Sequence, residues 1–423
     1  LFDCFQRNLY CIFNNKNIKS SIQPMIIHSI TDNIKKQIGN LFFWFLIFVI
    51  LFDPTGTILH KKDLMFVLVV AFNILFYKPD WSKLPWILLL FCAITIPYLI
   101  SCMRMTLVDE TEVLAVYKAI SPVLLLLWIR NYDLIKLSKG PVVICCILMT
   151  MLFFLILYYP QLEAPIYYWQ AAAGFPIIIN HRTFLGISMF VMYLKSYVAF
   201  VFIIAYYFYV VFSGAHRNIL TFIYLFFICF AFSVSGTRST MLLPTFMLII
   251  VGYITSANKK YAKYILYPII FIIGLAFIIL LIALISDTGE ASNAVKYGHI
   301  PSYIQLFEEH PEYILIGQGP GAFMYSEGFN KVVFKTEWTY LELVRNYGLF
   351  SLIIIGVFAK PLITMWKHRR DAFCKCMFFA YLSYLLIAGT NPLLLSSTGM
   401  IVLLMAYSYE ESITSQDVNK QQK

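Results

Sequence analysis

Apolar runs separated by short polar connections dominate the hydrophobic pattern of this chain. A bilayer core needs about 20 mostly apolar residues per helix, and somewhat fewer when flanking side chains reach the interface. The pattern therefore predicts about twelve transmembrane helices, at residues 41–52, 64–77, 84–100, 113–129, 142–158, 183–212, 219–234, 239–255, 264–285, 340–358, 373–388 and 393–407. The run at 41–52 is short, and the run at 183–212 is long and contains Lys195.

One long polar loop, residues 286–338, interrupts this pattern, and we expect the chemistry of the protein to lie there. Within it, residues 301–309 predict a short amphipathic helix with apolar side chains that can rest on the membrane. The expected organisation is a cytoplasmic N-terminal segment, nine helices, a large periplasmic loop, three helices and a cytoplasmic tail, at residues 1–40, 41–285, 286–338, 339–409 and 410–423.

The composition agrees with an all-α polytopic membrane protein. Hydrophobic residues make up 60% of the chain and charged residues only 13%, a balance that cannot cover the surface of a soluble fold. The net charge of +10 is spread over short loops without interleaved aromatic residues, so it does not indicate nucleic-acid binding. The nine cysteines show neither metal-ligand nor disulfide spacing and are expected to be structural.

Lysine and arginine collect in three connections, which predicts that these connections are cytoplasmic. They contain Arg130, Lys136 and Lys139; Lys259, Lys260 and Lys263; and Lys360, Lys367, Arg369 and Arg370. The clusters agree on one side if 183–212 is a single tilted span, whereas two helices divided at Lys195 would place them on different sides. Both termini then join the cytoplasmic side, Lys61 and Lys62 are exceptions, and the loop 286–338 is extracytoplasmic.

Two groups of residues near the outer interface are candidates for binding an anion. Arg238, in the segment 236–240, is costly at that depth unless it is paired, solvated or facing an anion. The alternative is that it only reaches lipid phosphates. His181 and Arg182 precede another apolar run, where they could bind substrate or simply anchor a helix at the interface.

The long loop carries further candidates. Gly319 and Gly321 belong to the turn 317–321, which could present backbone N–H groups to a phosphate, although shaping the loop is the simpler interpretation. His299 lies upstream of that turn. The carboxylate of Glu337 sits where the loop enters a helix and could accept a proton from a sugar hydroxyl; the alternative is a helix cap.

Four residues close to Glu337 in the sequence complete this group. Trp338 and Tyr340 could shield the carboxylate and stack on sugar rings. Glu342 and Arg345 have the spacing of a pair on one helix face, which predicts an ion pair between them.

Four stretches together resemble the O-antigen polymerase and ligase superfamily: SGTRSTMLLP around Arg238, HPEYILIGQGPGAF, TEWTYLELVRNYGLFSLI and TNPLLLSSTG. The pattern is most similar to Wzy-type oligosaccharide repeat unit polymerases. The resemblance implies a GT-C-like fold and glycosyl transfer without metal or other cofactor. It also implies undecaprenyl-pyrophosphate-linked sugars as substrates, at the periplasmic face of the bacterial inner membrane.

The same resemblance implies roles for single residues. Arg238 would hold the pyrophosphate with help from Arg182, and Glu337 would be the base. The family often has an arginine upstream in the loop, where this chain offers only His299. The ligase branch usually carries His-Asn before its Tyr-Leu pair, whereas this chain has Glu337 and Trp338, which favours a polymerase.

Other functions stay open at this point. A ligase that transfers finished glycan to a lipid A core would use the same chemistry. A lipid-linked sugar flippase would also have many helices, but it would more often show matching halves and charged residues near mid-membrane. A polymerase would be expected to work with membrane lipid, a chain-length regulator and a flippase.

Overall fold

A computed structural model of the chain describes residues 22–59, 61–173, 176–184, 187–214, 218–256, 264, 267–268, 271–275, 278–279, 282 and 291–421. Most of these residues are helical, and two short antiparallel two-stranded sheets accompany the helices. The basic cluster at Lys259 to Lys263 and most of the span predicted at 264–285 lie outside the described residues.

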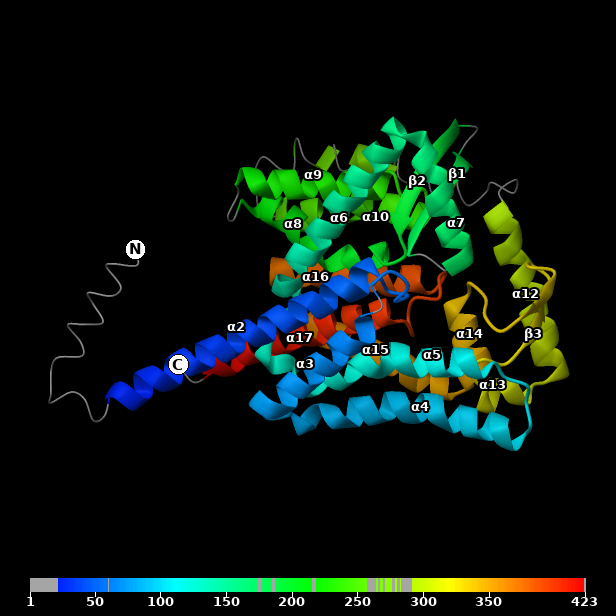
Figure 1. Cartoon of the computed structure of the whole chain (residues 1–423), viewed down its shortest axis with the longest axis horizontal. Coiled ribbons are helices and arrows are strands. Elements are labelled where there is room, and N and C mark those ends of the chain that lie inside the picture. Colours follow the sequence, from blue (N-terminus) through cyan, green and yellow to red (C-terminus); the bar gives the residue numbers. More distant parts are fainter. Residues whose placement is uncertain are drawn as a thin grey trace.

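Long helices run back and forth roughly along the long axis of the molecule (Figure 1). They are α2 (Ile22–Phe52), α3 (Lys62–Phe76), α4 (Leu84–Met103), α5 (Glu110–Ile120), α6 (Leu134–Tyr158), α8 (Val201–Ser213), α9 (Ile219–Ser233), α10 (Arg238–Ser256), α15 (Phe350–Lys367), α16 (Ala372–Ala388) and α17 (Ser397–Gln421). Short 3₁₀ helices extend or join them: η1 (Trp81–Lys83), η2 (Ser121–Asn131), η3 (Pro160–Leu162) and η4 (Tyr197–Phe200).

The length and apolar composition of the helices suit a membrane. Within the residues that the structure describes, six helical stretches are long and apolar enough to cross one: Asp32–Phe52, Trp81–Met103, Glu110–Asn131, Leu134–Tyr158, Arg238–Ser256 and Phe350–Lys367. Only 33% to 50% of the residues in each are buried, so large apolar side chains such as Leu41, Leu99 and Phe154 face outward. Apolar surface on this scale needs lipid around it. The chain is therefore an all-α membrane protein.

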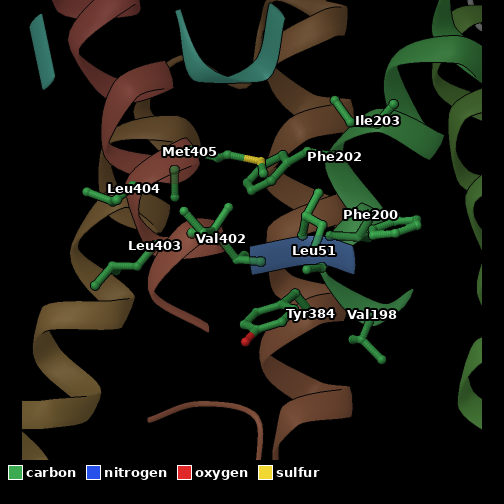
Figure 2. Packing of buried hydrophobic residues seen from close by; sticks show 14 of the residues in the cluster. Leu51, Val198, Phe200, Phe202, Ile203, Tyr384, Val402, Leu403, Leu404 and Met405 are labelled. Carbon is green, nitrogen blue, oxygen red and sulfur yellow. The ribbon is translucent and has the colours of Figure 1, made fainter. Parts of the chain in front are cut away.

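The core lies where α2, α8, α16 and α17 meet, around Leu51, Phe202, Tyr384 and Met405 (Figure 2). Every side chain from 400 to 407 in α17 is fully buried. A helix that is apolar all round in this way is surrounded by other helices. The first half of α17 is thus the central helix of the bundle, and the lipid-facing helices pack outside it.

The single tilted span predicted at 183–212 is wrong. The structure has an antiparallel hairpin, β1 (Ile177–Phe184) and β2 (Ile187–Leu194), followed by η4 and α8. Isoleucine, valine and aromatic residues are frequent in the two strands, and these types favour strands over helices. Lys195 follows directly where the hairpin ends. Because a hairpin begins and ends on the same side, the division at Lys195 leaves the sidedness of the later helices unchanged.

Three other helices have bounds that differ from the predicted apolar runs. The run 340–358 is divided into α14 (Thr339–Tyr347) and α15 by Gly348, whose φ is +55° and whose position leaves no room for a Cβ beside Leu315. Helix α2 begins at Ile22, inside the segment predicted to precede the first helix. Helix α17 continues to Gln421, through the predicted tail. Apolar runs mark only the lipid-facing part of a helix, and polar turns can extend it.

Residues 291–347 form a compact layer across one end of the bundle, at the right of Figure 1. We call this the loop end. It contains α12 (Ala291–Glu309), α13 (Glu312–Ile316), β3 (Met324–Ser326), β4 (Lys331–Val333) and α14. The short helix predicted at 301–309 is the second half of α12. Helix α7 (Glu163–Ala173) and the β1–β2 hairpin lie at the same end.

Contacts within the bundle place the long loop and the basic connections at opposite ends. At the loop end, Val108 forms a bridge with Ala322 and the N–H of Asp109 donates to the carbonyl of Gly321, 2.9 Å away. The α4–α5 connection, predicted to be extracytoplasmic, therefore lies on the side of the long loop. At the opposite end, which we call the basic end, two hollows bring together cationic residues of α2, η2, α6 and the α15–α16 turn.

This arrangement predicts opposite accessibility for two exposed positions, Glu327 at the loop end and Arg369 at the basic end. In a chain without its native cysteines, Glu327→Cys should react with a membrane-impermeant maleimide on intact cells. Arg369→Cys should react only after the membrane is opened, because a charged reagent does not cross the bilayer. Labelling of both cysteines from outside, or of Arg369→Cys alone, would contradict the orientation.

Candidate functional site

The guanidinium of Arg345 organises the loop end. It is fully buried and donates five hydrogen bonds, over 2.6 to 3.2 Å, to oxygens of Glu342, Gln318, Ala322 and Phe334. The ion pair predicted between Glu342 and Arg345 is confirmed, with 2.6 Å between Nη2 and Oε2. The three other acceptors belong to the glycine-rich turn and to the segment after β4. A buried guanidinium is stable only when its donors are satisfied, so these segments are fixed to α14.

The second oxygen of Glu342 extends this network toward Glu337. Its Oε1 accepts the Tyr303 hydroxyl of α12 at 2.7 Å and the N–H of Thr336 at 2.9 Å. Burial by itself raises the pKa of Glu342, but Arg345 and the hydrogen bonds outweigh it and hold that pKa below its usual value. Glu342 therefore stays ionised and holds the backbone at Thr336, directly before Glu337.

Glu337 faces α12 and is not a helix cap. Its Oε2 lies 3.4 Å from Nζ of Lys296, and α14 begins only at Thr339, after an N-cap residue, Trp338, that makes no side-chain cap. The Trp338 indole donates to the Lys296 carbonyl at 2.8 Å, and Lys296 Nζ also donates to the carbonyl of Thr390 at 3.3 Å. The side chain of Glu337 is 37% exposed, so a ligand can reach its carboxylate.

Arg238 reaches the same helix. At the start of α10, its Nη1 donates to Oδ1 of Asn293 at 2.7 Å. Asn293 and Lys296 are three residues apart in α12, so they project from one face of that helix. Helix α12 thus connects Arg238 with Glu337, two residues that are about a hundred positions apart in the chain.

Arg182 joins the site through the hairpin. Its Nη1 donates to the carbonyl of Gly236 at 3.1 Å, in the turn that precedes Arg238. Gly236 has a φ of +63°, and a Cβ there would meet Val191 at 2.3 Å, so only glycine fits between the turn and β2. Arg182 and Arg238 are therefore held on the two sides of one tight turn.

Charges at both ends of this group affect the pKa of Tyr193 in β2. Burial raises the pKa of its hydroxyl, the charge of Arg182 opposes that shift, and Glu337 adds to it. The charges of Arg182 and Glu337 therefore both act on the pKa of this phenol. The structure thus brings together Arg182, Arg238 and Glu337, the three residues proposed to act on the pyrophosphate and the sugar.

The other predicted residues have mainly structural contacts. His181 is exposed and pairs with Glu163 of α7, with 2.9 Å between Nε2 and Oε1, as an interface anchor would. His299 is fully buried, and its Nδ1 lies 2.8 Å from Oγ of Ser326. Burial lowers the pKa of His299, so its imidazole is neutral near pH 7. A buried neutral ring is unsuited to the phosphate contact expected of it.

The glycine turn shapes the loop and presents no row of open amides. The N–H groups of Gln318 and Gly319 donate to the carbonyls of Arg345 and Asn346 at 2.6 and 3.0 Å. A Cβ on Gly319 would meet Ser101 of α4 at 2.4 Å, and one on Gly321 would meet the carbonyl of Asp109 at 2.8 Å. These glycines let the loop approach α4 and α5. The simpler interpretation of the turn is the one the structure supports.

Contacts within the protein also occupy part of the Tyr340 side chain. Its hydroxyl donates to the carbonyl of Leu385 in α16 at 2.7 Å, and its ring lies against Gly389. Only 37% of the residue is exposed. Trp338 and Tyr340 therefore hold α14 between α12 and α16, and any stacking on a sugar ring would use the ring surface that these contacts leave open.

A cavity of about 420 Å³ adjoins this group, and the sequence did not reveal it. Its wall includes Thr237 and Ser239, which flank Arg238, together with two lysines, Lys195 and Lys335. Hydroxyl or amide side chains of Thr55, Tyr193, Thr240, Asn391, Ser396, Ser397 and Thr398 complete its polar lining. Cations, hydroxyls and amides together suit an anionic ligand that is rich in hydroxyl groups.

The two lysines reach the cavity in different ways. Lys195 ends the hairpin, and burial lowers the pKa of its ammonium. Lys335 lies in the segment held by Arg345 and pairs with Glu112 of α5, with 3.0 Å between Nζ and Oε1. The signal for Lys195 was its place inside an apolar run, where a cation usually marks a functional site or a helix end. No local signal pointed to Lys335.

In the described part of the chain, His, Cys, Asp and Glu side chains form no group of three that could hold a metal ion. Comparison with known proteins finds no matching family model, no matching curated protein and no matching solved structure. The resemblance to O-antigen polymerases therefore stays a prediction, and the geometry of the loop end carries the functional argument.

The network around Arg345 predicts a large loss of stability in Arg345→Lys. Lysine keeps the charge but cannot satisfy the separated acceptors, so the free energy of unfolding should fall by about 3–5 kcal/mol. The matched change Arg369→Lys, at an exposed position, should alter it by less than about 0.5 kcal/mol. Thermal unfolding of both purified variants in one detergent measures the difference. Equal transition temperatures would show that the loop end does not depend on this guanidinium.

Proposed function

We propose that this protein is a polymerase of undecaprenyl-pyrophosphate-linked oligosaccharide repeat units, of the O-antigen or capsule type. The observation that carries the proposal is the cationic, hydroxyl-lined cavity of about 420 Å³ beside Arg238. A sugar pyrophosphate combines two negative phosphates with many hydroxyls, and this cavity offers a partner for each. The sequence resemblance names the substrate class, and the cavity is consistent with it.

An apolar groove supports a lipid-linked substrate. A hollow of about 320 Å³ lies between α10 and α16, and it is lined by Leu242, Leu243, Phe246, Leu386 and Ile387. Ser239 lines both this groove and the polar cavity. A molecule with a polar head and a long apolar chain could place its head in the cavity and the start of its chain in the groove.

The proposed reaction is displacement at an anomeric carbon. The growing glycan on one lipid pyrophosphate is the donor, and a hydroxyl of a new lipid-linked repeat is the acceptor. Glu337 takes the proton of that hydroxyl as the new glycosidic bond forms. The bond to the pyrophosphate breaks, and the leaving group keeps the electron pair. Arg238 and Arg182 stabilise its charge, and Lys296 orients the carboxylate of Glu337.

The finer architecture belongs to this proposal too. About twelve transmembrane helices would form a GT-C-like bundle in the bacterial inner membrane, with the loop end facing the periplasm. Transfer would need no metal or other cofactor. A flippase would deliver the lipid-linked repeat to the loop end, and a chain-length regulator would bind the polymerase to set the extent of polymerisation.

A ligase is the second candidate, because the same donor and chemistry would serve it. The acceptor separates the two functions, since a ligase transfers a finished glycan to lipid A core. A lipid-linked sugar flippase is a weaker candidate. Polar groups that could bind a sugar pyrophosphate gather at the loop end, whereas a transporter places its site near mid-membrane.

Substitutions at Glu337 separate proton transfer from a structural role. Glu337→Gln keeps the size of the side chain but cannot accept a proton as a carboxylate does, so the rate should fall by about two to four orders of magnitude. Glu337→Asp keeps the carboxylate but withdraws it, so it should be impaired less than Glu337→Gln. The readout is polymer formed from purified lipid-linked repeat by equal amounts of folded protein.

Glu308→Gln is the matched control, because Glu308 is an exposed carboxylate of α12 at the same end of the bundle. It should polymerise at the parental rate. Loss of the partly exposed pair with Lys296 costs Glu337→Gln no more than about 1 kcal/mol of stability, so its thermal unfolding should stay close to parental. If Glu337→Gln polymerises as fast as Glu308→Gln, Glu337 is not the base.

A further inference from the structure

The basic end contains a hollow of about 600 Å³ that the proposed reaction does not use. It lies between the start of α6, Tyr206 of α8, the α15–α16 turn and α17. Four basic side chains line it, namely Lys136, Lys139, Lys367 and Arg370, together with two carboxylates, Asp133 and Asp371. The fixed charge of the wall is therefore four positive and two negative groups, a net of +2.

The two carboxylates accept hydrogen bonds from backbone N–H groups. Asp133 accepts the N–H of Lys136 at 3.0 Å as the N-cap of α6. Asp371 accepts the N–H of Cys374 at 2.7 Å as the N-cap of α16. Within the described parts of the chain, no carboxylate lies within ion-pair distance of the four cations around this hollow.

Three other cations at the same end have carboxylate partners from the protein. Lys83 pairs with Glu411, Lys360 pairs with Glu410, and Arg130 lies 3.7 Å from both Asp80 and Glu411. The enrichment of Lys and Arg on the cytoplasmic side explains why basic residues occur at this end. It does not explain why four cations converge on one hollow whose two carboxylates leave a net charge of +2, where the cations repel each other unless an anion joins them.

One side of the hollow is aromatic. Lys139 Nζ lies 3.3 Å from the centre of the Tyr206 ring, and Phe373 packs edge-on against Tyr206 and Tyr409. Beside it, in the last turns of α15, Ile363 and Trp366 are 59% and 45% exposed. An outward-facing tryptophan next to an apolar side chain is typical of the interface between headgroups and acyl chains. These side chains beside the hollow are the types found at the depth of lipid phosphates.

We propose that this hollow binds the phosphate headgroup of an anionic membrane lipid such as phosphatidylglycerol or cardiolipin. Basic pockets between transmembrane helices at the cytoplasmic surface suit such headgroups. Lys136, Lys139, Lys367 and Arg370 bind the phosphate oxygens, and the aromatic wall contacts the glycerol and the first carbons of the acyl chains. This site is at the opposite end from the proposed glycosyl transfer and does not depend on it.

The test is equilibrium binding of fluorescent cardiolipin to the purified full-length protein in a neutral detergent. The double variant Lys139→Gln with Arg370→Gln removes two of the four cations. It should bind about 25-fold more weakly, at about fivefold per charge. Arg369→Gln is the matched control, since the Arg369 guanidinium stacks 4.7 Å from the Trp366 ring and does not line the hollow. Its affinity should stay within about twofold of parental.

A charge-preserving variant separates binding from folding. Lys139→Arg with Arg370→Lys should bind cardiolipin within about threefold of the parental protein, because the site recognises charge near a phosphate. The proposal is overturned if the double Gln variant binds as well as the parental protein. It is also overturned if phosphatidylcholine competes as well as phosphatidylglycerol. Complete displacement by inorganic phosphate would assign the hollow to a soluble anion and equally contradict a lipid site.

Discussion

The buried guanidinium of Arg345 is the interaction on which the loop end depends. It ties α14 to the glycine-rich turn and to the segment after β4. Through Glu342 it also fixes Tyr303 of α12 and the backbone at Thr336. A charge of this kind, removed from water, cannot be left without partners, so the segments that satisfy it have little freedom. The positions of Glu337 and Lys296, which contact each other beside the cavity, therefore depend on this network.

Much of the fold could be predicted because lipid imposes a simple rule on sequence. Side chains facing the bilayer must be apolar, so α3, α4, α9, α10 and α16 begin and end close to the predicted runs. The rule does not distinguish lipid-facing from protein-facing apolar residues, and the β1–β2 hairpin was missed for that reason. The charge pattern remained informative even there, because a hairpin returns the chain to its starting side and leaves later sidedness intact.

The sequence predicted several residues of the site but not the contacts between them. The sequence pointed to Arg182, Arg238 and Glu337 because a charged group near a bilayer is costly unless it is paired, solvated or functional. The structure brings these three residues together. Their partners Asn293, Lys296 and Gly236 could not be found from sequence, since these contacts join distant segments and no local pattern records them. His299 and the glycine turn show the converse, because residue types suited to phosphate binding proved to be occupied by the protein itself.

The two ends of the bundle therefore present different chemistry, with a hydroxyl-lined cavity between Lys195 and Lys335 at one end and a basic hollow at the other. We propose that the first of these joins lipid-linked repeats into polymer. Analysis of surface glycan from a strain that lacks this gene tests it most directly. If the protein is a polymerase, lipid A core should carry a single repeat unit, and the intact gene should restore full-length polymer. Polymer that accumulates on undecaprenyl pyrophosphate, without transfer to core, would contradict a polymerase and identify a ligase.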